Sequence, residues 1–283
     1  MALRPAMEKF STLFATLYLI PAQAILGLLI IFMMIGFTWL HHAQALHGNL
    51  PKFRPLPALD TLRAALRRGA ETGRAIHLSP GAGSIGQPPA MAQTMAGILA
   101  AARVIEETAL KGTPVLVTSG DAVAHLALKG ALRQAYQHAG QAQDYAPASV
   151  RLLALEAPTA YAMGLMTTYS PQRFEASQII GPLGPEFILA GEEAAQYSIP
   201  QLVGTTSVSA LPLLFLVSPS VLIGEEIFAT EAYLTASSTP QARLLTQDAL
   251  RLTLSLLVVG GLLFQSLVAL QPMLPFTLPF LVP

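Results

Sequence analysis

The stretch IHLSPGAGSIG, residues 76–86, joins a short apolar run to a glycine-rich turn. Its glycines, Gly81, Gly83 and Gly86, have the G-x-G-x-x-G spacing that can bind dinucleotide phosphates when it connects a strand to a helix. Residues 88–110 follow with apolar side chains at helical spacing. The order strand, turn, helix is the unit from which parallel α/β sheets are built.

The same unit recurs further along the chain. The pattern predicts strands at residues 114–121, 150–155 and 176–181, and helices at 122–140, 159–168 and from 186 onward. Apolar strands alternating with helices favour a parallel sheet that helices cover on both faces. We therefore expect an α/β fold: a mostly parallel, doubly wound, Rossmann-like sheet flanked by N- and C-terminal transmembrane helices.

Residues 210–223 form an apolar run that Pro212 and Pro219 interrupt. The run is short for a membrane span, which needs about 20 apolar residues. A buried strand–helix pair is the favoured interpretation, and a re-entrant membrane segment is the alternative.

Both ends of the chain are apolar enough to cross a bilayer. Residues 11–40 and 252–283 carry no charge. The first stretch is longer than the apolar region of a signal peptide, about 7–15 residues, so an uncleaved anchor is expected. The predicted organisation is an N-terminal transmembrane anchor (1–45), an α/β soluble domain (46–240), a C-terminal transmembrane helix (241–271) and an apolar proline-rich tail (272–283).

Basic residues near the spans predict the orientation of the chain. Arg4 and Lys9 precede the first span, whereas the residues that follow it include Lys52, Arg54, Arg63, Arg67, Arg68 and Arg74. Arg243 and Arg251 precede the second span, and no basic residue follows it. Because Lys and Arg collect on the cytoplasmic side, we expect a bacterial inner-membrane protein with a cytoplasmic soluble domain and both termini outside.

Composition excludes several classes of function. Sixteen Lys and Arg balance sixteen Asp and Glu, so no excess of positive charge suggests a nucleic-acid partner. The chain has no cysteine, which excludes disulfides, thiolate metal sites and a cysteine nucleophile. Hydrophobic residues make up 53% of the chain and the mean hydropathy is +0.53, as expected for a protein that is part soluble and part membrane-embedded.

The glycine turn is the candidate ligand site, because ligands of open parallel sheets bind beyond the carboxyl ends of the strands. The candidate binding residues are Gly81, Gly83, Ser84 and Gly86 of this turn, with Ser119 and Asp121 at the end of the second strand.

Two features argue against a standard dinucleotide site at this turn. Pro88 and Pro89 follow the third glycine, and the nearest acidic residue at a second-strand end, Asp121, stands far beyond the usual spacing of about 20 residues. No Walker-type phosphate loop is present in the sequence. A dinucleotide site, a site for another anionic ligand and a purely structural turn are the three alternatives, and no cofactor is specified.

Paired glutamates form a second candidate feature. Glu192–Glu193 and Glu225–Glu226 each follow a glycine, in a segment without Lys or Arg between Arg173 and Arg243. Such carboxylates could bind a divalent cation, but no metal-ligand motif accompanies them. We expect Glu225 or Glu226 to be partly buried against an arginine or against backbone amides at a helix start. His77, in the first strand, is interpreted as a residue at the edge of the core.

Several motifs resemble one known family. IHLSPGAGSIG, IIGPLGPEFILAGEE, QLVGTTS and LIGEEIFATEAYL, with the later QDALR, are similar in that order to a family of bacterial membrane proteins catalogued only as a domain of unknown function. The resemblance covers roughly residues 74–260. It implies one domain between two anchors, and it implies no substrate and no catalytic residue.

Two classes of function follow. The favoured one is a membrane-anchored scaffold or assembly subunit, in which the α/β domain mediates self-association or partner docking and the bilayer is the other partner. A homo-oligomer or a subunit of a membrane complex is expected. The alternative is a nucleotide- or anion-binding sensor or enzyme that uses the glycine-rich loop, so whether the chain is an enzyme is open.

Overall fold

A computed structural model describes residues 22–47, 53–86, 88, 90–170, 173–235 and 237–270. The chain divides into two compact units. One comprises residues 52–236, and the other comprises residues 1–51 together with 237–283. The first is called the α/β unit. The second contains two helices that are long and apolar enough to cross a membrane and is called the membrane-helix unit for that reason.

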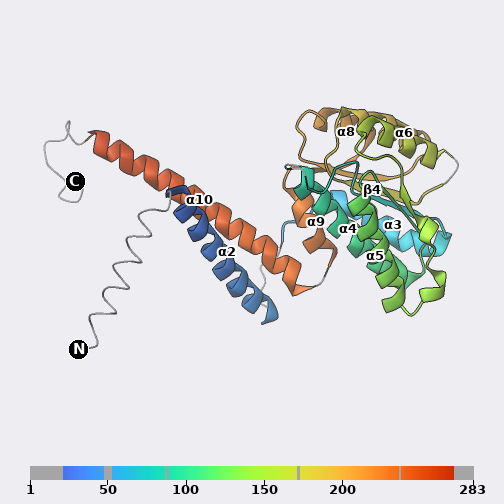
Figure 1. The fold of residues 1–283 in the computed structure, drawn as a ribbon, viewed down its shortest axis with the longest axis horizontal. Coiled ribbons are helices and arrows are strands. Elements are labelled where there is room, and N and C mark those ends of the chain that lie inside the picture. Colours follow the sequence, from blue (N-terminus) through green and yellow to red (C-terminus); the bar gives the residue numbers. More distant parts are fainter. Residues whose placement is uncertain are drawn as a thin grey trace. The chain divides into compact units, whose positions relative to one another are not determined.

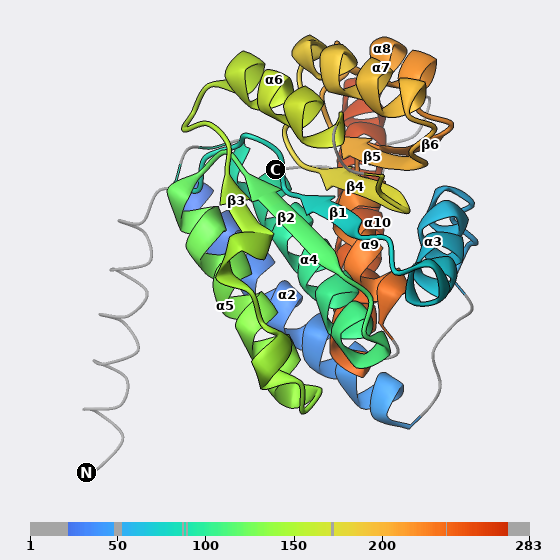
Figure 2. The same cartoon turned by 90° about the vertical axis from the view of Figure 1, so that its right-hand side faces the viewer.

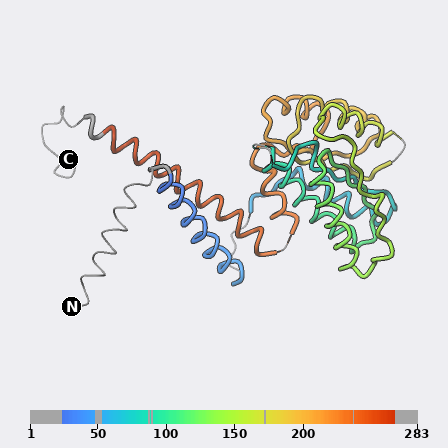
Figure 3. Tube along the Cα trace, in the orientation of Figure 1, coloured from blue at the N-terminus to red at the C-terminus, as the bar shows by residue number. Residues whose placement is uncertain are grey.

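The described part of the α/β unit contains a sheet of six strands in the order β3-β2-β1-β4-β5-β6, and every neighbouring pair is parallel. The strands are β1 (Ile76–Ser79), β2 (Val115–Ser119), β3 (Val150–Leu152), β4 (Ala176–Ile180), β5 (Gln201–Thr205) and β6 (Ser220–Ile223). The chain builds outward from β1 to β3, returns to pair β4 with β1, and continues to β6. Figure 3 traces the chain of this unit from blue-green to orange. This order is that of doubly wound dinucleotide-binding sheets and confirms the predicted fold class.

Helices cover both faces of the sheet (Figures 1 and 2). One face carries α3 (Ala58–Thr72), α4 (Ala90–Lys111), α5 (Ala122–His138) and α9 (Glu226–Leu234). The other carries α6 (Pro158–Tyr169), α7 (Ile188–Gln196) and α8 (Leu211–Val217). Three short 3-10 turns complete the unit: η1 (Ala142–Asp144), η2 (Pro147–Ser149) and η3 (Pro185–Phe187).

Two apolar cores lie on the two faces, because successive strand residues point in opposite directions. Leu78 of β1 and Val117 of β2 belong to the core under α3, α4 and α5. Leu116 and Ile179 belong to the core under α6, α7 and α8. Burying one such side chain contributes about 1.5–3 kcal/mol, so the continuous apolar strands stabilise both layers.

Helix α3 is an element that the sequence pattern did not predict. Leu59, Leu62 and Leu66 are buried on one side of it, and it packs against β4, β5 and β6. The helix ends at Gly73, whose φ of 67° is the left-handed conformation that glycine adopts without strain. An ion pair of 2.6 Å between Arg68 Nε and Glu175 Oε1 joins α3 to the start of β4.

The apolar run 210–223 forms α8 and then β6. Pro212 stands in the first turn of α8, where its missing N–H costs no helical hydrogen bond, and Pro219 directly precedes β6. The run thus contains a helix followed by a strand, which is the reverse of the order in which the strand–helix pair was named. β6 is largely buried, but Leu214 is the one residue of α8 that is fully buried, and Phe215 and Leu216 are exposed.

The membrane-helix unit contains α2 (Ala22–Leu46) and α10 (Ser238–Leu270), which pack side by side (Figure 1). His41 Nδ1 and Thr246 Oγ1 lie 3.3 Å apart between them. Within the two helices, segments Ala24–Leu46 and Ser238–Ser266 are long and apolar enough to cross a membrane. The predicted tail at 272–283 lies outside the described residues.

Candidate functional site

The carboxyl ends of all six parallel strands meet at one edge of the sheet, called the carboxyl edge below. From β1 the chain proceeds toward the β3 edge of the sheet, and from β4 it proceeds toward the β6 edge. The strand order therefore reverses between β1 and β4. In open α/β sheets this switch point is where ligands bind. The glycine turn after β1 therefore lies where the sequence analysis expected it.

The turn after β1 is fixed by hydrogen bonds to its neighbours. Ser79 Oγ accepts a hydrogen bond of 2.8 Å from the Gly81 N–H, and the Gly81 carbonyl accepts one of 3.1 Å from the Gly120 N–H. Gly81 has a φ of 80°, which favours glycine at this position. The turn is thus tied both to its own strand and to the end of β2.

Loops from β1, β2 and β4 fill the space at the switch point. A Cβ added at Gly83 would lie 2.1 Å from Pro182 Cγ, and one at Gly181 would lie 2.0 Å from the Pro80 carbonyl oxygen. A Cβ at Gly120 would lie 2.6 Å from the Cα of Ala82. These glycines allow the loops to pack against one another, so their role in the structure is close packing of the protein itself.

Gly97 of α4 has the role that the third glycine has in a dinucleotide fingerprint, the close approach of helix and sheet. A Cβ there would lie 1.9 Å from the Ile180 carbonyl oxygen. Gly86, the third glycine of the sequence motif, is exposed and has open space around its Cβ position. The role of Gly97 could not be predicted from the sequence, because a glycine inside a helical pattern carries no signal of which residues pack against it.

An acidic group of side chains lies beside the turn. Ser84 Oγ lies 3.3 Å from Asp121 Oδ2 and 3.3 Å from Glu156 Oε1. Asp121 also caps α5, accepting a hydrogen bond of 2.8 Å from the Ala124 N–H. Glu156 adopts a φ of 50°, a left-handed conformation that is uncommon outside glycine. Sequence patterns gave no reason to select Glu156, because only the fold brings the end of β3 beside this turn.

These two carboxylates determine which ligand chemistry this turn can accept. A phosphate placed at Ser84 would face Asp121 and Glu156, and like charges repel each other. Among the described residues no group of three or more His, Cys, Asp or Glu side chains could hold a metal ion. The local charges are therefore unfavourable for an anion.

The six predicted binding residues have different environments. Gly81, Gly83, Ser84 and Asp121 are brought together at the switch point. Gly86 lies at the exposed end of the turn. Ser119 is fully buried in β2, and its hydroxyl has no hydrogen-bond partner within the described ranges.

A hydrogen-bonded network of six polar side chains lies inside the core under α6. His77 Nδ1 lies 2.8 Å from Ser177 Oγ, and its Nε2 lies 2.9 Å from Thr118 Oγ1. Two tyrosines of α6 complete the network, which reaches the glycine turn through Ser79; its members are His77, Ser79, Thr118, Tyr161, Tyr169 and Ser177.

Burial controls the protonation of this network. Complete burial lowers the pKa of His77 to about 3, because the charged imidazolium would lose its hydration. Burial also raises the pKa of Tyr161 to about 12. His77 is therefore neutral and fully buried, which corrects its interpretation as a residue at the edge of the core.

The expectation for the glutamates is confirmed at Glu226, the first residue of α9. Its Oε1 forms an ion pair of 2.8 Å with Arg54, and its Oε2 accepts a hydrogen bond of 3.0 Å from the Ile223 N–H. Its side chain is 25% exposed. The carboxylate thus joins the first residues of the α/β unit to the turn after β6.

Comparison with known proteins gives one match. Residues 16–273 match the family described as a domain of unknown function (DUF6754). The chain belongs to this family. The DUF6754 match covers α2, α10 and the whole α/β unit, and it confirms the predicted membership of a family described only as a domain of unknown function. No curated protein and no solved structure matches the chain.

Proposed function

We propose that the chain is a membrane-anchored assembly subunit whose α/β domain associates with a second copy of itself through the carboxyl edge of the sheet. The observation that supports this proposal is a set of exposed apolar side chains on the loops and helix starts that follow the strands: Met91, Met95, Val123, Leu126, Leu155, Val208, Ile223 and Phe228. Leu126 is 67% exposed and Val208 is 79% exposed. Concentration of such residues on one side of a soluble domain is typical of an interaction surface.

The chemistry of this edge fits a second copy. An apolar surface is complementary to itself, so a symmetric dimer can bury the exposed apolar side chains of this edge on both sides at once. Anchoring in one membrane would hold every copy with the same orientation and at high local concentration.

The membrane helices support the same proposal. Positions Gly27 and Gly36 of α2, with Gly260 and Gly261 of α10, have nothing within 4 Å of an added Cβ. They therefore do not serve the packing of α2 against α10. Small residues at a free helix surface allow a second helix to approach closely in lipid. We place the protein in a bacterial inner membrane, with the α/β domain in the cytoplasm, because basic residues flank the domain sides of both spans.

Cysteine cross-linking of the full-length protein in membranes tests this proposal, because the chain has no native cysteine. We expect Leu126→Cys to form a disulfide-linked dimer on mild oxidation. Leu110→Cys is the matched control, because Leu110 is 71% exposed but lies near the end of α4, at the opposite edge of the sheet. Equal cross-linking of the two variants, or a monomeric mass in nanodiscs, would contradict self-association.

The alternative function is a nucleotide- or anion-binding sensor or enzyme, and the strand order favours it. Thermal unfolding of the detergent-purified protein with nucleotides and divalent cations tests it, because a ligand that binds the folded state raises the melting temperature. A rise that Ser84→Ala abolishes would support a ligand at the glycine turn.

A further inference from the structure

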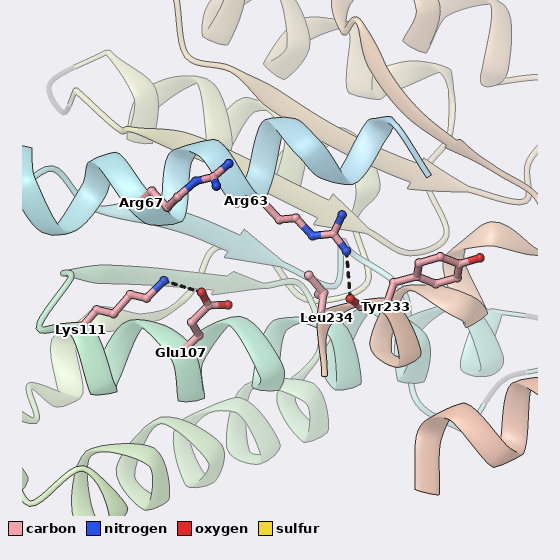
Figure 4. Close-up of a pocket in the computed structure, with 6 residues that line it drawn as sticks. All are labelled: Arg63, Arg67, Glu107, Lys111, Tyr233 and Leu234. Carbon is pink, nitrogen blue, oxygen red and sulfur yellow. Dashed lines mark hydrogen bonds and ion pairs between the residues drawn. The ribbon is translucent and has the colours of Figure 1, made fainter. Parts of the chain in front are cut away.

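A pocket of about 270 Å³ lies on the α3 side of the sheet, away from the carboxyl edge. It opens between α3 and α4 and is bounded at one end by the last residues of α9 (Figure 4). The residues that line it are Arg63, Arg67, Glu107, Lys111, Tyr233 and Leu234.

Helical spacing brings the charged groups of the pocket together. Arg63 and Arg67 stand four residues apart on α3, and Glu107 and Lys111 stand four apart on α4, so each pair shares one helix face. Three cations and one carboxylate line the space. The pocket therefore has an excess of positive charge, in contrast to the acidic group at the glycine turn.

The three cations differ in the partners they have. Lys111 Nζ pairs with Glu107 Oε1 at 2.5 Å. Arg63 forms an ion pair of 3.2 Å with Asp60 Oδ1 and donates to the Tyr233 carbonyl at 3.1 Å. Arg67 forms no hydrogen bond or ion pair with any residue that the structure describes. Its guanidinium can therefore use all five N–H donors for a ligand.

We propose that this pocket binds a phosphate group, with Arg67 as the main ligand and Arg63 and Lys111 as supporting cations. Guanidinium binds phosphate through two parallel hydrogen bonds, which makes arginine better suited than lysine to this ligand. The volume is at the low end for ligand pockets, which suits a single headgroup better than a dinucleotide. This inference is independent of the proposed self-association.

Two sources could supply the phosphate: an anionic lipid or a free phosphate in solution. Leu234, which lines the pocket, is followed after three residues by α10, one of the two candidate membrane spans. Anionic lipids attract basic residues close to a membrane surface. The ligand chemistry is the same in both cases, so the experiment must separate the two sources.

The test is thermal unfolding of the full-length protein in a zwitterionic detergent at constant ionic strength. Four probes are added separately: short-chain phosphatidic acid, short-chain phosphatidylcholine, glycerol 3-phosphate and inorganic phosphate. We expect phosphatidic acid to raise the melting temperature with a saturable concentration dependence, and phosphatidylcholine to leave it unchanged.

Three variants define the role of the pocket. Arg67→Gln should raise about tenfold the apparent Kd for the phosphate probe, obtained from the concentration dependence of the melting temperature. The reason is that it removes a charged ligand worth about 1.4 kcal/mol. Arg67→Lys should restore only part of the affinity for the phosphate probe that Arg67→Gln loses. The matched control is Arg133→Gln, which removes an exposed arginine from α5, a helix that does not line the pocket, and should behave as the wild type.

Each outcome bears on the inference. Stabilisation by phosphatidic acid alone identifies a lipid headgroup, and stabilisation by inorganic phosphate as well identifies a general phosphate site. Absence of stabilisation by all three phosphate probes would overturn the inference. Equal responses of Arg67→Gln and Arg133→Gln would also overturn it, since the effect would then come from general charge.

Discussion

His77 shows how one buried titratable side chain can control the stability of the domain. Its pKa is lowered from 6.5 to about 3 by burial, so the unfolded chain binds a proton at mildly acidic pH that the folded chain does not bind. The stability that depends on neutral His77 is complete above about pH 6.5. It falls as the pH decreases toward 3.

We therefore expect the wild type to lose stability between pH 6.5 and pH 4 with a contribution of up to about 1.4 kcal/mol per pH unit from His77. His77→Gln should reduce this slope, because glutamine can donate and accept hydrogen bonds but does not titrate in this range. The melting temperature of the full-length protein, measured across this pH range, is the readout. His138→Gln, at an exposed position of α5, should keep the wild-type slope. An unchanged slope in His77→Gln would exclude this role.

Gly97 carries the second prediction at the scale of single residues. Its Cβ position lies 1.9 Å from a backbone oxygen of Ile180 and 2.9 Å from the Cα of Pro80, and neither backbone atom can move without shifting the sheet. Gly97→Ala should therefore lower the free energy of unfolding by at least about 1–3 kcal/mol, the usual cost of overpacking.

Gly130→Ala is the matched control for Gly97→Ala. Gly130 also lies within a helix, α5, and has nothing within 4 Å of its Cβ position. This substitution should stabilise the protein by roughly 0.5–1 kcal/mol, because alanine loses less backbone entropy on folding. Chemical denaturation gives the free energy of unfolding of both variants. If both substitutions change it in the same direction, the close contact at Gly97 does not determine the stability of the domain.

At the scale of elements, the sequence predicted β1 to β4 and the helices that follow them, but it did not predict α3 or β5. β1, α4, β2 and α5 were predictable because apolar strands and helices are separated there by clear glycine and proline signals. α3 was missed because three arginines and two acids lie among its buried leucines, and no N-terminal capping residue marks its start. The amphipathic spacing of Leu59, Leu62 and Leu66 is the signal that could have revealed it.

The candidate site was less predictable than the fold. The glycine turn and Asp121 could be selected from sequence, because strand ends and helix caps have local signatures. Glu156 and the network around His77 could not, because their partners come from other strands and from α6. The sequence of the glycine turn does not reveal whether the turn binds a ligand or packs against Pro182, because that outcome depends on contacts between residues far apart in the chain.

The attachment of α3 gives a prediction at the same scale. Glu175 is 7% exposed and depends on Arg68 of α3 and on the Thr72 hydroxyl for its hydrogen bonds. Arg68→Met should destabilise the domain by about 1–3 kcal/mol, because it leaves a buried carboxylate without its charged partner. Arg67→Met on the same helix removes a cation without a protein partner in the described ranges and should change stability by less than about 0.5 kcal/mol. Denaturant midpoints of the two variants measure the difference, and equal midpoints would show that the ion pair does not hold α3 in place.

At the scale of the whole molecule, two candidate spans enclose one soluble domain in the chain order. An even number of spans places both termini on one side of the membrane and the domain on the other. The family match includes both helices and the domain between them, so this arrangement belongs to the family sequence as a whole. The proposed orientation rests on basic residues, which are more numerous after the first span than before it and which precede the second span but do not follow it.

We expect a membrane-impermeant maleimide to label Ala2→Cys in intact bacterial spheroplasts and to label Leu110→Cys only after the membrane is permeabilised. Leu110 is 71% exposed on α4, so the reagent can reach it once it enters the cytoplasm. The absence of native cysteine removes background labelling. Labelling of Leu110→Cys in intact spheroplasts, with protection of Ala2→Cys, would reverse the orientation. The α/β unit would then lie on the outer side of the membrane, so this measurement also decides which lipids are available to the proposed phosphate site.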